Sequence, residues 1–279
     1  MTVGTRFAPS PTGRLHLGHV FAAQVAHSLA RATGGVFLLR HEDIDGLRVR
    51  EEFYQGIEQD LTWLGLTWDG EALRQTSRIA AYDAALESLR EMNFIYPCFC
   101  TRREIQEEWA RMGAAPQGPE APVYPRTCRK LTASEQRTKI ASGTPYAWRL
   151  DSAKAGKLAG PLTFRDLRHG EICVNPDLLG DVVLARKDIG TAYHLAVVVD
   201  DAFQQITHVT RGEDLLSSTH VHRLLQVLLE LPEPVYFHHA LVLDAAGQRL
   251  AKRNDAQSIK TLRDSGMTPA EVLAEAPSR

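Results

Sequence analysis

Residues 6–19 read RFAPSPTGRLHLGH, and this stretch decides the fold because it joins a short apolar segment to the start of a helix. Residues 3–8 suit a buried strand, and a loop rich in proline and glycine follows them. Residues 17–33 are rich in alanine and leucine, and the pair beginning at Gly34 ends this predicted helix. Residues 36–39 form a second apolar run that predicts a buried strand. This order is a βαβ unit, which predicts an α/β fold with a parallel sheet.

The pattern continues beyond the first unit. Apolar residues recur at helical spacing in residues 53–64 and 82–89, and residues 221–229 predict a strongly apolar helix. Residues 195–199 and 241–243 are apolar and strand-like. Between these regions, from residue 97 to about residue 160, polar and charged side chains dominate and several prolines and glycines occur. We interpret that region as an insertion with a small fold of its own.

The overall composition excludes some classes of function. The 279 residues include 32 Lys plus Arg against 34 Asp plus Glu, so the net charge of −2 gives no global attraction to nucleic acid or anionic membrane. Any RNA contact must therefore use a local basic patch. The first fourteen residues do not resemble a secretory signal, and the longest apolar runs are too short to span a bilayer. The cysteine spacing does not suggest a secreted disulfide framework, so we expect a cytoplasmic protein.

Two histidines mark the point where the predicted loop becomes a helix. His16 and His19 lie three positions apart, so a helix presents both on one face beside its positive N-terminal end. Gly18 between them has no side chain, which lets a phosphate or a flat base approach the backbone. The arrangement suits a nucleotide triphosphate. The alternative is two unrelated histidines at a helix start.

A basic segment follows the last strand-like run. Residues 248–253 read QRLAKR, and a basic loop in this position could close over a triphosphate and neutralise charge that develops during a reaction. The alternative is a solvated turn without function.

Three cysteines suggest a metal site. Cys98, Cys100 and Cys128 could supply three thiolates to zinc, whose structural sites usually have four ligands. No histidine occurs between His41 and His169, so Tyr124 is the best local candidate for the fourth ligand. The alternative is three free thiols in a polar insertion.

These motifs together resemble those of the class I aminoacyl-tRNA synthetases, and in particular their glutamyl branch. Residues 16–19 are similar to the HIGH motif of the family, and residues 249–253 to its KMSKS motif. The resemblance continues in the same order over nearly the whole chain, in residues 6–13, 40–45, 193–201 and 211–214.

The resemblance implies a role for each matched residue. The groups implied in ATP binding are His16, Gly18, His19, Arg249 and Lys252, with His16, His19 and Lys252 taking part in catalysis and Mg²⁺ accompanying the ATP. The implied glutamate pocket consists of Arg6, Ala8, Ser10, Glu42, Tyr193 and Arg211. These residue types suit a dicarboxylate substrate, because guanidinium groups bind carboxylates and a carboxylate binds the substrate ammonium. The alternative for Arg6 and Glu42 is an internal ion pair.

Three positions depart from the family pattern. Ala251 replaces the serine of the basic loop, and Arg249 replaces its first lysine. Because Lys252 is retained, we expect weaker control by the loop rather than loss of activity. His41 stands where an apolar residue is usual.

The resemblance also implies a domain organisation. It consists of a Rossmann-like catalytic domain in two halves, an inserted acceptor-type domain with zinc held by Cys98, Cys100, Tyr124 and Cys128, and a basic loop with a helical C-terminus. The expected boundaries are 1–95, 96–189, 190–245 and 246–279. The short tail leaves room for two short helices and no anticodon-binding domain.

A short tail and the Cys-x-Cys, Tyr-x3-Cys pattern resemble the truncated members of the branch. These enzymes activate glutamate and attach it to queuosine in the anticodon of tRNA(Asp). We therefore expect glutamate, ATP and tRNA as partners of a monomeric enzyme. Basic residues of the insertion could contact tRNA phosphates: Arg102, Arg103, Arg126, Arg129 and Lys130. The alternative is that these side chains only keep the zinc-binding insertion solvated.

Two other functions stay open from the sequence. One is a minimal glutamyl-tRNA synthetase that charges the 3′ end of tRNA(Glu). The other is a non-catalytic RNA-binding relative, against which the retained His16, His19 and Lys252 argue.

Overall fold

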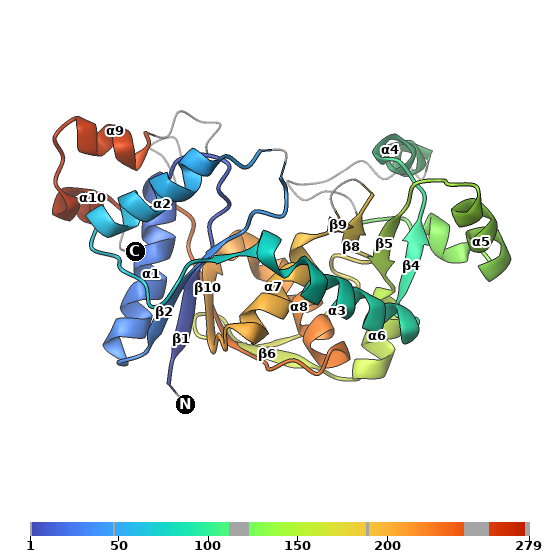
Figure 1. The fold of residues 1–279 in the computed structure, drawn as a ribbon. Coiled ribbons are helices and arrows are strands. Elements are labelled where there is room, and N and C mark those ends of the chain that lie inside the picture. Colours follow the sequence, from blue (N-terminus) through green and yellow to red (C-terminus); the bar gives the residue numbers. More distant parts are fainter. Residues whose placement is uncertain (1, 47, 112–122, 188–189, 243–256, 277–279) are drawn as a thin grey trace.

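The first βαβ unit builds a parallel sheet, as the sequence predicts (Figure 1). Strand β1 (Gly4–Phe7) pairs in parallel with β2 (Val36–His41), and helix α1 (Leu17–Ala32) connects them. Gly34 follows the helix with a φ of 65°, the left-handed conformation that commonly ends helices. The computed structural model describes residues 2–46, 48–111, 123–187, 190–242 and 257–276.

A second sheet continues the first. Strand β10 (His208–Gly212) pairs in parallel with β11 (Val235–His239), and β11 pairs in parallel with β6 (Thr163–Asp166). Strand β7 (Gly170–Cys173) completes this sheet in antiparallel orientation. The two sheets meet at β1 and β10, where the backbone N–H of Gly4 donates to the Thr207 hydroxyl at 2.8 Å.

A third, antiparallel sheet lies at the far end of the molecule from α1 (Figure 1). Its strands, in spatial order, are β4 (Ile95–Cys98), β5 (Ala147–Leu150), β8 (Val183–Arg186) and β9 (Gly190–Thr191). Within the predicted insertion, β6 and β7 therefore join the sheet of β10 and β11, whereas β4, β5 and β8 form a sheet of their own.

Helices and short elements surround these sheets. The remaining helices of the described chain are α2 (Glu51–Trp63), α3 (Ile79–Glu91), α4 (Arg102–Arg111), α5 (Ala133–Ala141), α6 (Ser152–Ala159), α7 (Tyr193–Phe203), α8 (Leu216–Leu228), α9 (Ile259–Asp264) and α10 (Pro269–Glu275). The short elements are strand β3 (Leu73–Arg74), which extends the first sheet beside β2, and the 3-10 helices η1 (Gln75–Arg78), η2 (Thr127–Lys130) and η3 (Glu213–Leu215).

Two predicted strands are wrong. Residues 195–199 lie inside α7, where Leu195, Ala196 and Val197 are all buried. An apolar run that is buried on every side has no periodicity that separates a helix from a strand. Residues 241–242 follow β11, which ends at His239, and they continue as irregular chain.

Two apolar cores support the sheets. One packs α1 against β1 and β2, and α2, α9 and α10 contribute side chains to it. The other packs α7 and α8 against the third sheet, with α3 and α6 at its border. In the described residues, no helix has the length and apolar character needed to cross a membrane.

Candidate active site

The two predicted histidines cap the N-terminus of α1. His16 is the N-cap residue, and its Nδ1 accepts a hydrogen bond from the Gly18 backbone N–H at 3.2 Å. The Nδ1 of His19 in turn accepts from the backbone N–H of His16 at 3.2 Å. A neutral imidazole that accepts at Nδ1 carries its proton on Nε2. Both rings therefore offer an Nε2–H donor at the positive end of the helix, which favours an anionic ligand.

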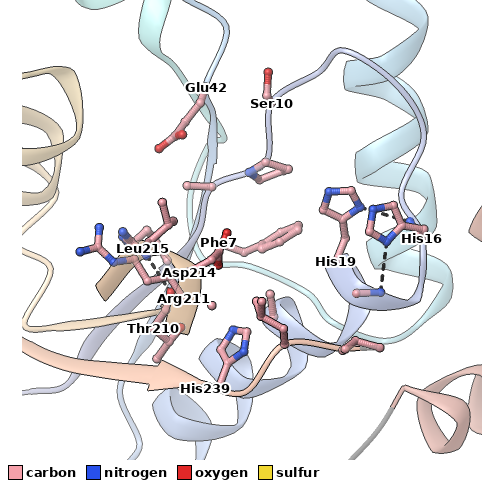
Figure 2. A pocket seen from close by; sticks show the side chains of 18 of the residues that line it. Phe7, Ser10, His16, His19, Glu42, Thr210, Arg211, Asp214, Leu215 and His239 are labelled. Carbon is pink, nitrogen blue, oxygen red and sulfur yellow. Dashed lines mark hydrogen bonds between the residues drawn. The ribbon is translucent and has the colours of Figure 1, made fainter. Parts of the chain in front are cut away.

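A pocket of about 420 Å³ opens beside these histidines, at the carboxyl ends of β1, β10 and β11 (Figure 2). Nine of its lining residues are ones that the sequence predicts for ATP or glutamate binding: Arg6, Ala8, Ser10, His16, Gly18, His19, Glu42, Tyr193 and Arg211. The carboxyl edge of a parallel sheet is the usual place for a ligand in such folds. The other two predicted ATP-binding residues, Arg249 and Lys252, lie outside the described residues.

Several lining residues escape prediction. Thr210, His239 and Val242 border the pocket, yet no motif indicates them, whereas Asp214 belongs to the matched segment 211–214. Thr210 and His239 lie on β10 and β11, which the sequence does not predict as strands.

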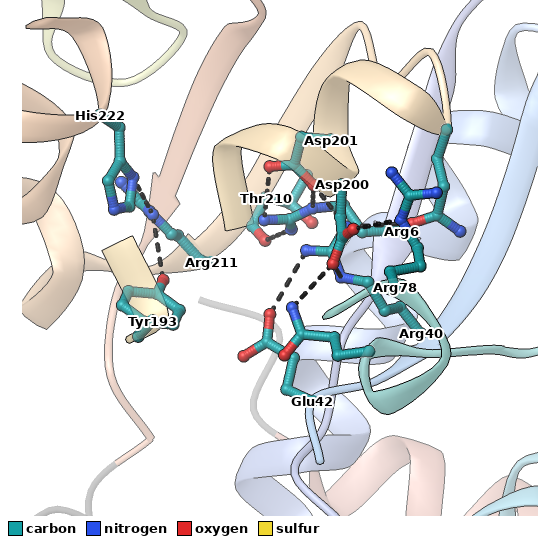
Figure 3. Close-up of polar contacts among 12 residues, drawn as sticks. Arg6, Arg40, Glu42, Arg78, Tyr193, Asp200, Asp201, Thr210, Arg211 and His222 are labelled. Carbon is teal, nitrogen blue, oxygen red and sulfur yellow. Dashed lines mark hydrogen bonds and ion pairs between the residues drawn. The ribbon is translucent and has the colours of Figure 1, made fainter. Parts of the chain in front are cut away.

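Arg6 is held by a buried ion pair. Its Nε donates to Oδ1 of Asp201 at 2.9 Å, and its NH1 donates to the Thr210 carbonyl at 3.1 Å. The same carboxylate oxygen accepts from NH1 of Arg40 at 2.8 Å (Figure 3). Burial opposes ionisation of Asp201, but the two guanidinium groups outweigh burial and lower its pKa. Arg6 is therefore fixed in place with its charge compensated.

Glu42 projects toward the same pocket from the segment after β2 (Figure 2). Its Oε1 accepts from NH2 of Arg40 at 3.3 Å, and its backbone N–H donates to the Pro9 carbonyl at 3.0 Å. Burial raises the pKa of this carboxyl, while Arg40 and Arg6 act in the opposite direction. The side chain keeps 18% of its surface exposed, so a substrate cation can reach it.

Asp200 supports this network from behind and was not predicted as a site residue. Its oxygens accept from Gln75 at 2.8 Å, from Arg78 at 2.7 Å and from the Tyr82 hydroxyl at 2.7 Å. The adjacent pair Asp200 and Asp201 directly follows an apolar run, and this pattern could have indicated a buried ion-pair network. Buried charges occur almost only when they are paired.

Arg211 extends from β10 on the other side of the pocket (Figure 3). Its NH1 donates to the Tyr193 hydroxyl at 3.3 Å, which brings two of the predicted glutamate-binding residues into contact. Tyr193 begins α7, and Arg211 lies next to the pocket-lining Gly212.

His41, the unusual position, lies away from the pocket. It is fully buried, its Nε2 is 3.1 Å from Oε1 of Glu58, and its ring packs edge-on against Tyr54. Burial lowers its pKa, although Glu58 opposes this. His41 therefore joins β2 to α2 and belongs to the packing of that helix.

The predicted metal ligands come together in the structure. The sulfur atoms of Cys98, Cys100 and Cys128 all lie within 4.8 Å of one another. The Tyr124 hydroxyl lies 3.4 Å from the Cys100 sulfur. The backbone N–H of Phe99 donates to the Cys128 sulfur at 3.3 Å, a contact that stabilises a thiolate. This donor set suits a zinc ion.

Two of the arginines that are expected to contact tRNA also form ion pairs within the protein. Arg126 forms ion pairs with Asp177 and Asp181. Arg129 lies 3.2 Å from Asp151 and 3.6 Å from Asp181, which is fully buried. Both side chains keep 32% of their surface exposed, so their contact with tRNA phosphates stays a prediction, beside a structural role in pairing with the buried Asp181.

Comparison with known proteins identifies the class. The model of the family "tRNA synthetases class I (E and Q), catalytic domain" matches residues 2–276, and the chain belongs to this family. Its relatives include a protein of Rhodobacter capsulatus named Glutamyl-Q tRNA(Asp) synthetase, 47% identical over 274 residues, which cover 96% of this chain and 97% of that protein. A protein of the same name from Nocardia farcinica is 45% identical, with 96% of this chain and 82% of that protein covered.

Solved structures show the same fold. A glutamate-tRNA synthetase from Elizabethkingia anophelis superimposes with a TM-score of 0.80 at 30% identity, over 96% of this chain and 60% of that one. The chain is thus a ligase of the aminoacyl-tRNA synthetase type, as the sequence motifs predict.

Proposed function

We propose that this enzyme activates glutamate with ATP as glutamyl-adenylate and transfers the glutamyl group to queuosine in the anticodon of tRNA(Asp). The observation that carries the proposal is the single pocket in which Arg211 and Glu42 face the histidines that cap α1. The relatives named Glutamyl-Q tRNA(Asp) synthetase support the choice of acceptor.

Glutamate recognition follows from the charges of the pocket. Glu42 binds the substrate ammonium, and Arg211 binds the side-chain carboxylate. Arg6 forms the wall behind them. Ala8, Ser10 and Tyr193 shape the remaining surface.

Activation is an attack of the glutamate α-carboxylate oxygen on the α-phosphorus of ATP. A new P–O bond forms, the bond to the β-phosphate oxygen breaks, and pyrophosphate leaves. In this proposal His16 and His19 donate from Nε2 to phosphate oxygens, where charge develops in the transition state. Arg249 and Lys252 neutralise the leaving phosphates, and Mg²⁺ arrives with ATP.

Transfer uses a hydroxyl of the queuosine cyclopentene diol. This oxygen attacks the carbonyl carbon of the adenylate, an ester bond forms, and AMP leaves with the hydroxyl proton passing to its phosphate. The diol resembles the terminal ribose diol that ordinary synthetases acylate. We propose that residues 96–189 receive the nucleotide, while residues 1–95 and 190–245 carry out activation and residues 246–279 provide the basic loop.

The acceptor is tested in two stages. Glutamate-dependent ATP–pyrophosphate exchange should occur with Mg²⁺ and without RNA, because the described pocket already holds the proposed glutamate groups. Labelled glutamate should then transfer to tRNA(Asp) that contains queuosine and not to tRNA(Asp) that lacks it. Nuclease mapping should place the label in the anticodon loop.

A second candidate is charging of the 3′ end of tRNA(Glu), which the similarity to a glutamate-tRNA synthetase structure favours. Label at the terminal adenosine, or equal labelling of tRNA with and without queuosine, would establish this second function and exclude the first.

We also propose one zinc ion held by Cys98, Cys100, Tyr124 and Cys128, in a cytoplasmic enzyme. The ion would cross-link β4 to η2, and closely spaced thiols persist in a reducing compartment. Metal analysis should give about one equivalent per chain.

Single substitutions test this site. Cys128→Ser should lose the metal and loosen the third sheet, whereas Cys173→Ser, at an exposed cysteine on β7, should keep it. Tyr124→Phe tests the fourth ligand and should weaken zinc retention against a chelator. A metal-free native protein with three titratable thiols here would refute the site.

A further inference from the structure

Arg211 differs from the other arginines near the pocket in the kind of partner that holds it. Its Nε donates to Nε2 of His238 at 3.1 Å, and its NH1 donates to Nδ1 of His222 at 3.1 Å. Its NH2 donates to the Thr219 hydroxyl at 2.6 Å, and the Tyr193 hydroxyl receives the contact described above. All four acceptors are neutral groups. No ion pair to Arg211 is found within the described part of the chain.

The surrounding charges make this difference significant. In the neighbouring network, three guanidinium groups face three carboxylates, namely Arg6, Arg40 and Arg78 against Glu42, Asp200 and Asp201. That network is balanced. Arg211 is only 6% exposed, so its charge is neither balanced by a carboxylate nor strongly hydrated. Arg211 thus brings to the pocket a positive charge that no carboxylate contacts directly among the described residues, while Asp214 also lines the pocket.

The hydrogen bonds assign the tautomers of the two histidines. His222 accepts from Arg211 at Nδ1, so its proton lies on Nε2, which faces Nδ1 of His194 at 3.1 Å. His238 accepts at Nε2, so its Nδ1–H donates to Oδ2 of Asp166 at 2.7 Å. The Asp166 carboxylate therefore does not contact Arg211 directly, because the His238 ring lies between them. It is also held by the backbone N–H groups of Arg168 and His169.

Burial keeps both rings neutral. His238 is fully buried and His222 is 2% exposed. Burial, and then Arg211, lower the pKa of His222 well below its usual range and that of His238 to about 4. A protonated ring here would lose its acceptor and repel the guanidinium group.

We propose that His222 and His238 are positioning residues that hold Arg211 by neutral acceptors and so make the pocket select a side-chain carboxylate over a carboxamide. The inference rests on the proposed glutamate activation and extends it to glutamine rejection. Glutamate carries a net charge of −1, which matches the positive charge of Arg211. Glutamine is isosteric with glutamate but neutral, and would leave that buried charge unpaired. A carboxylate in place of either ring would form an ion pair with Arg211 within the protein. The pocket would then no longer favour glutamate over glutamine.

A matched pair of variants tests the role of charge. In His222→Asn the amide oxygen lies near the former Nδ1 position and stays a neutral acceptor, whereas His222→Asp has the same shape and adds a charge. We expect the preference for glutamate over glutamine, as the ratio of kcat/KM in ATP–pyrophosphate exchange, to stay within about threefold of wild type in His222→Asn. In His222→Asp the ratio should fall about tenfold or more, mainly through a higher KM for glutamate.

The controls separate this inference from the function on which it rests. Wild-type enzyme without glutamate-dependent exchange would overturn both. Normal wild-type exchange with equal selectivity in the two variants would overturn only the role of the histidines, because a structural role alone moves both variants together. If His222→Asp does not fold, Thr219→Asn and Thr219→Asp provide the same comparison at another Arg211 contact. The glutamate preference should again be kept in the Asn variant and fall in the Asp variant, and equal preference in both would count against the inference.

Discussion

At the residue scale, His16 and His19 combine two tasks that usually fall to different side chains. Each Nδ1 satisfies a backbone N–H at the start of α1, where such groups have no helical partner. In the proposed mechanism, Nε2 of each ring donates to the ligand. His16 is accordingly only 7% exposed, although it lines the pocket.

Two substitutions at His16 should separate capping from catalysis. Asparagine is a good N-cap and alanine is not, so His16→Ala should lose about 1 kcal/mol of stability and His16→Asn much less. Both lack the imidazole donor and should slow adenylate formation about a hundredfold or more. Urea unfolding and pyrophosphate exchange measure the two effects. Near-normal exchange in His16→Asn would show that capping is the only task of this residue.

The sequence could indicate which residues line the pocket but not which ones pair. Arg6 and Arg211 follow from motifs whose chemistry is local. The partner of Arg6 is Asp201, which is 195 positions away, and no spacing rule links them. The neutral partners of Arg211 are equally hidden, because a histidine in a sequence does not reveal its burial or its tautomer.

At the element scale, amphipathic helices were easier to predict than buried ones. Helix α2 has a polar outer face, and its apolar spacing indicates it correctly. Helix α7 packs against β8, α3 and α8, so residues 195–199 in its middle are all apolar and the helical spacing is lost there. The two short C-terminal helices α9 and α10 agree with the expectation from the length of the tail.

The contact between α2 and α9 contains a buried carboxylate whose ionised form destabilises the fold. Asp60 is fully buried, its oxygens have no hydrogen-bond partner among the described residues, and Arg263 approaches to 3.4 Å. Burial raises its pKa to about 6, although Arg263 and Arg14 oppose the rise. A raised carboxyl pKa stabilises the fold only at low pH. That contribution is present below about pH 4 and is lost as the pH rises through about 6.

Asp60→Asn should therefore stabilise the protein at pH 8 by about 2 kcal/mol and have little effect at pH 4. Urea unfolding at the two pH values measures the difference. Asp83→Asn, at an exposed position of α3, is the control and should leave stability unchanged at either pH. A destabilised Asp60→Asn at pH 8 would mean that its pairing with Arg263 outweighs the cost of burial.

At the scale of the whole molecule, the net charge of −2 leaves RNA binding to local patches. Arg126 and Arg129 both pair with the buried Asp181, so we expect them to contribute more to the stability of the insertion than exposed basic residues do. Arg102 at the start of α4 and Lys130 at the end of η2 are both exposed.

Two double variants should therefore behave differently. Arg102→Ala with Lys130→Ala should weaken glutamyl transfer to tRNA and lower the salt dependence of tRNA binding by about two phosphate contacts, with exchange unaffected. Arg126→Ala with Arg129→Ala should lower the stability of the insertion, because Asp181 would be left buried and unpaired. Salt titration of tRNA binding and thermal unfolding measure the two outcomes. The same loss of stability in both double variants would argue against a surface role for the first pair.

The junction of β1 and β10 has a consequence for the order of events during synthesis. Strand β1 packs beside β10, which begins at residue 208. Contacts between segments so far apart in the chain form slowly, because closing the long loop between them costs entropy. At the ribosome, α1 and β2 can pair with β1 early, whereas β10, which carries Arg211, and the later pocket residues His239, Leu241 and Val242 follow afterwards. A nascent chain stalled before residue 208 would thus hold the capping histidines and Glu42 without the cation opposite them, and glutamate could protect it neither from unfolding nor from proteolysis.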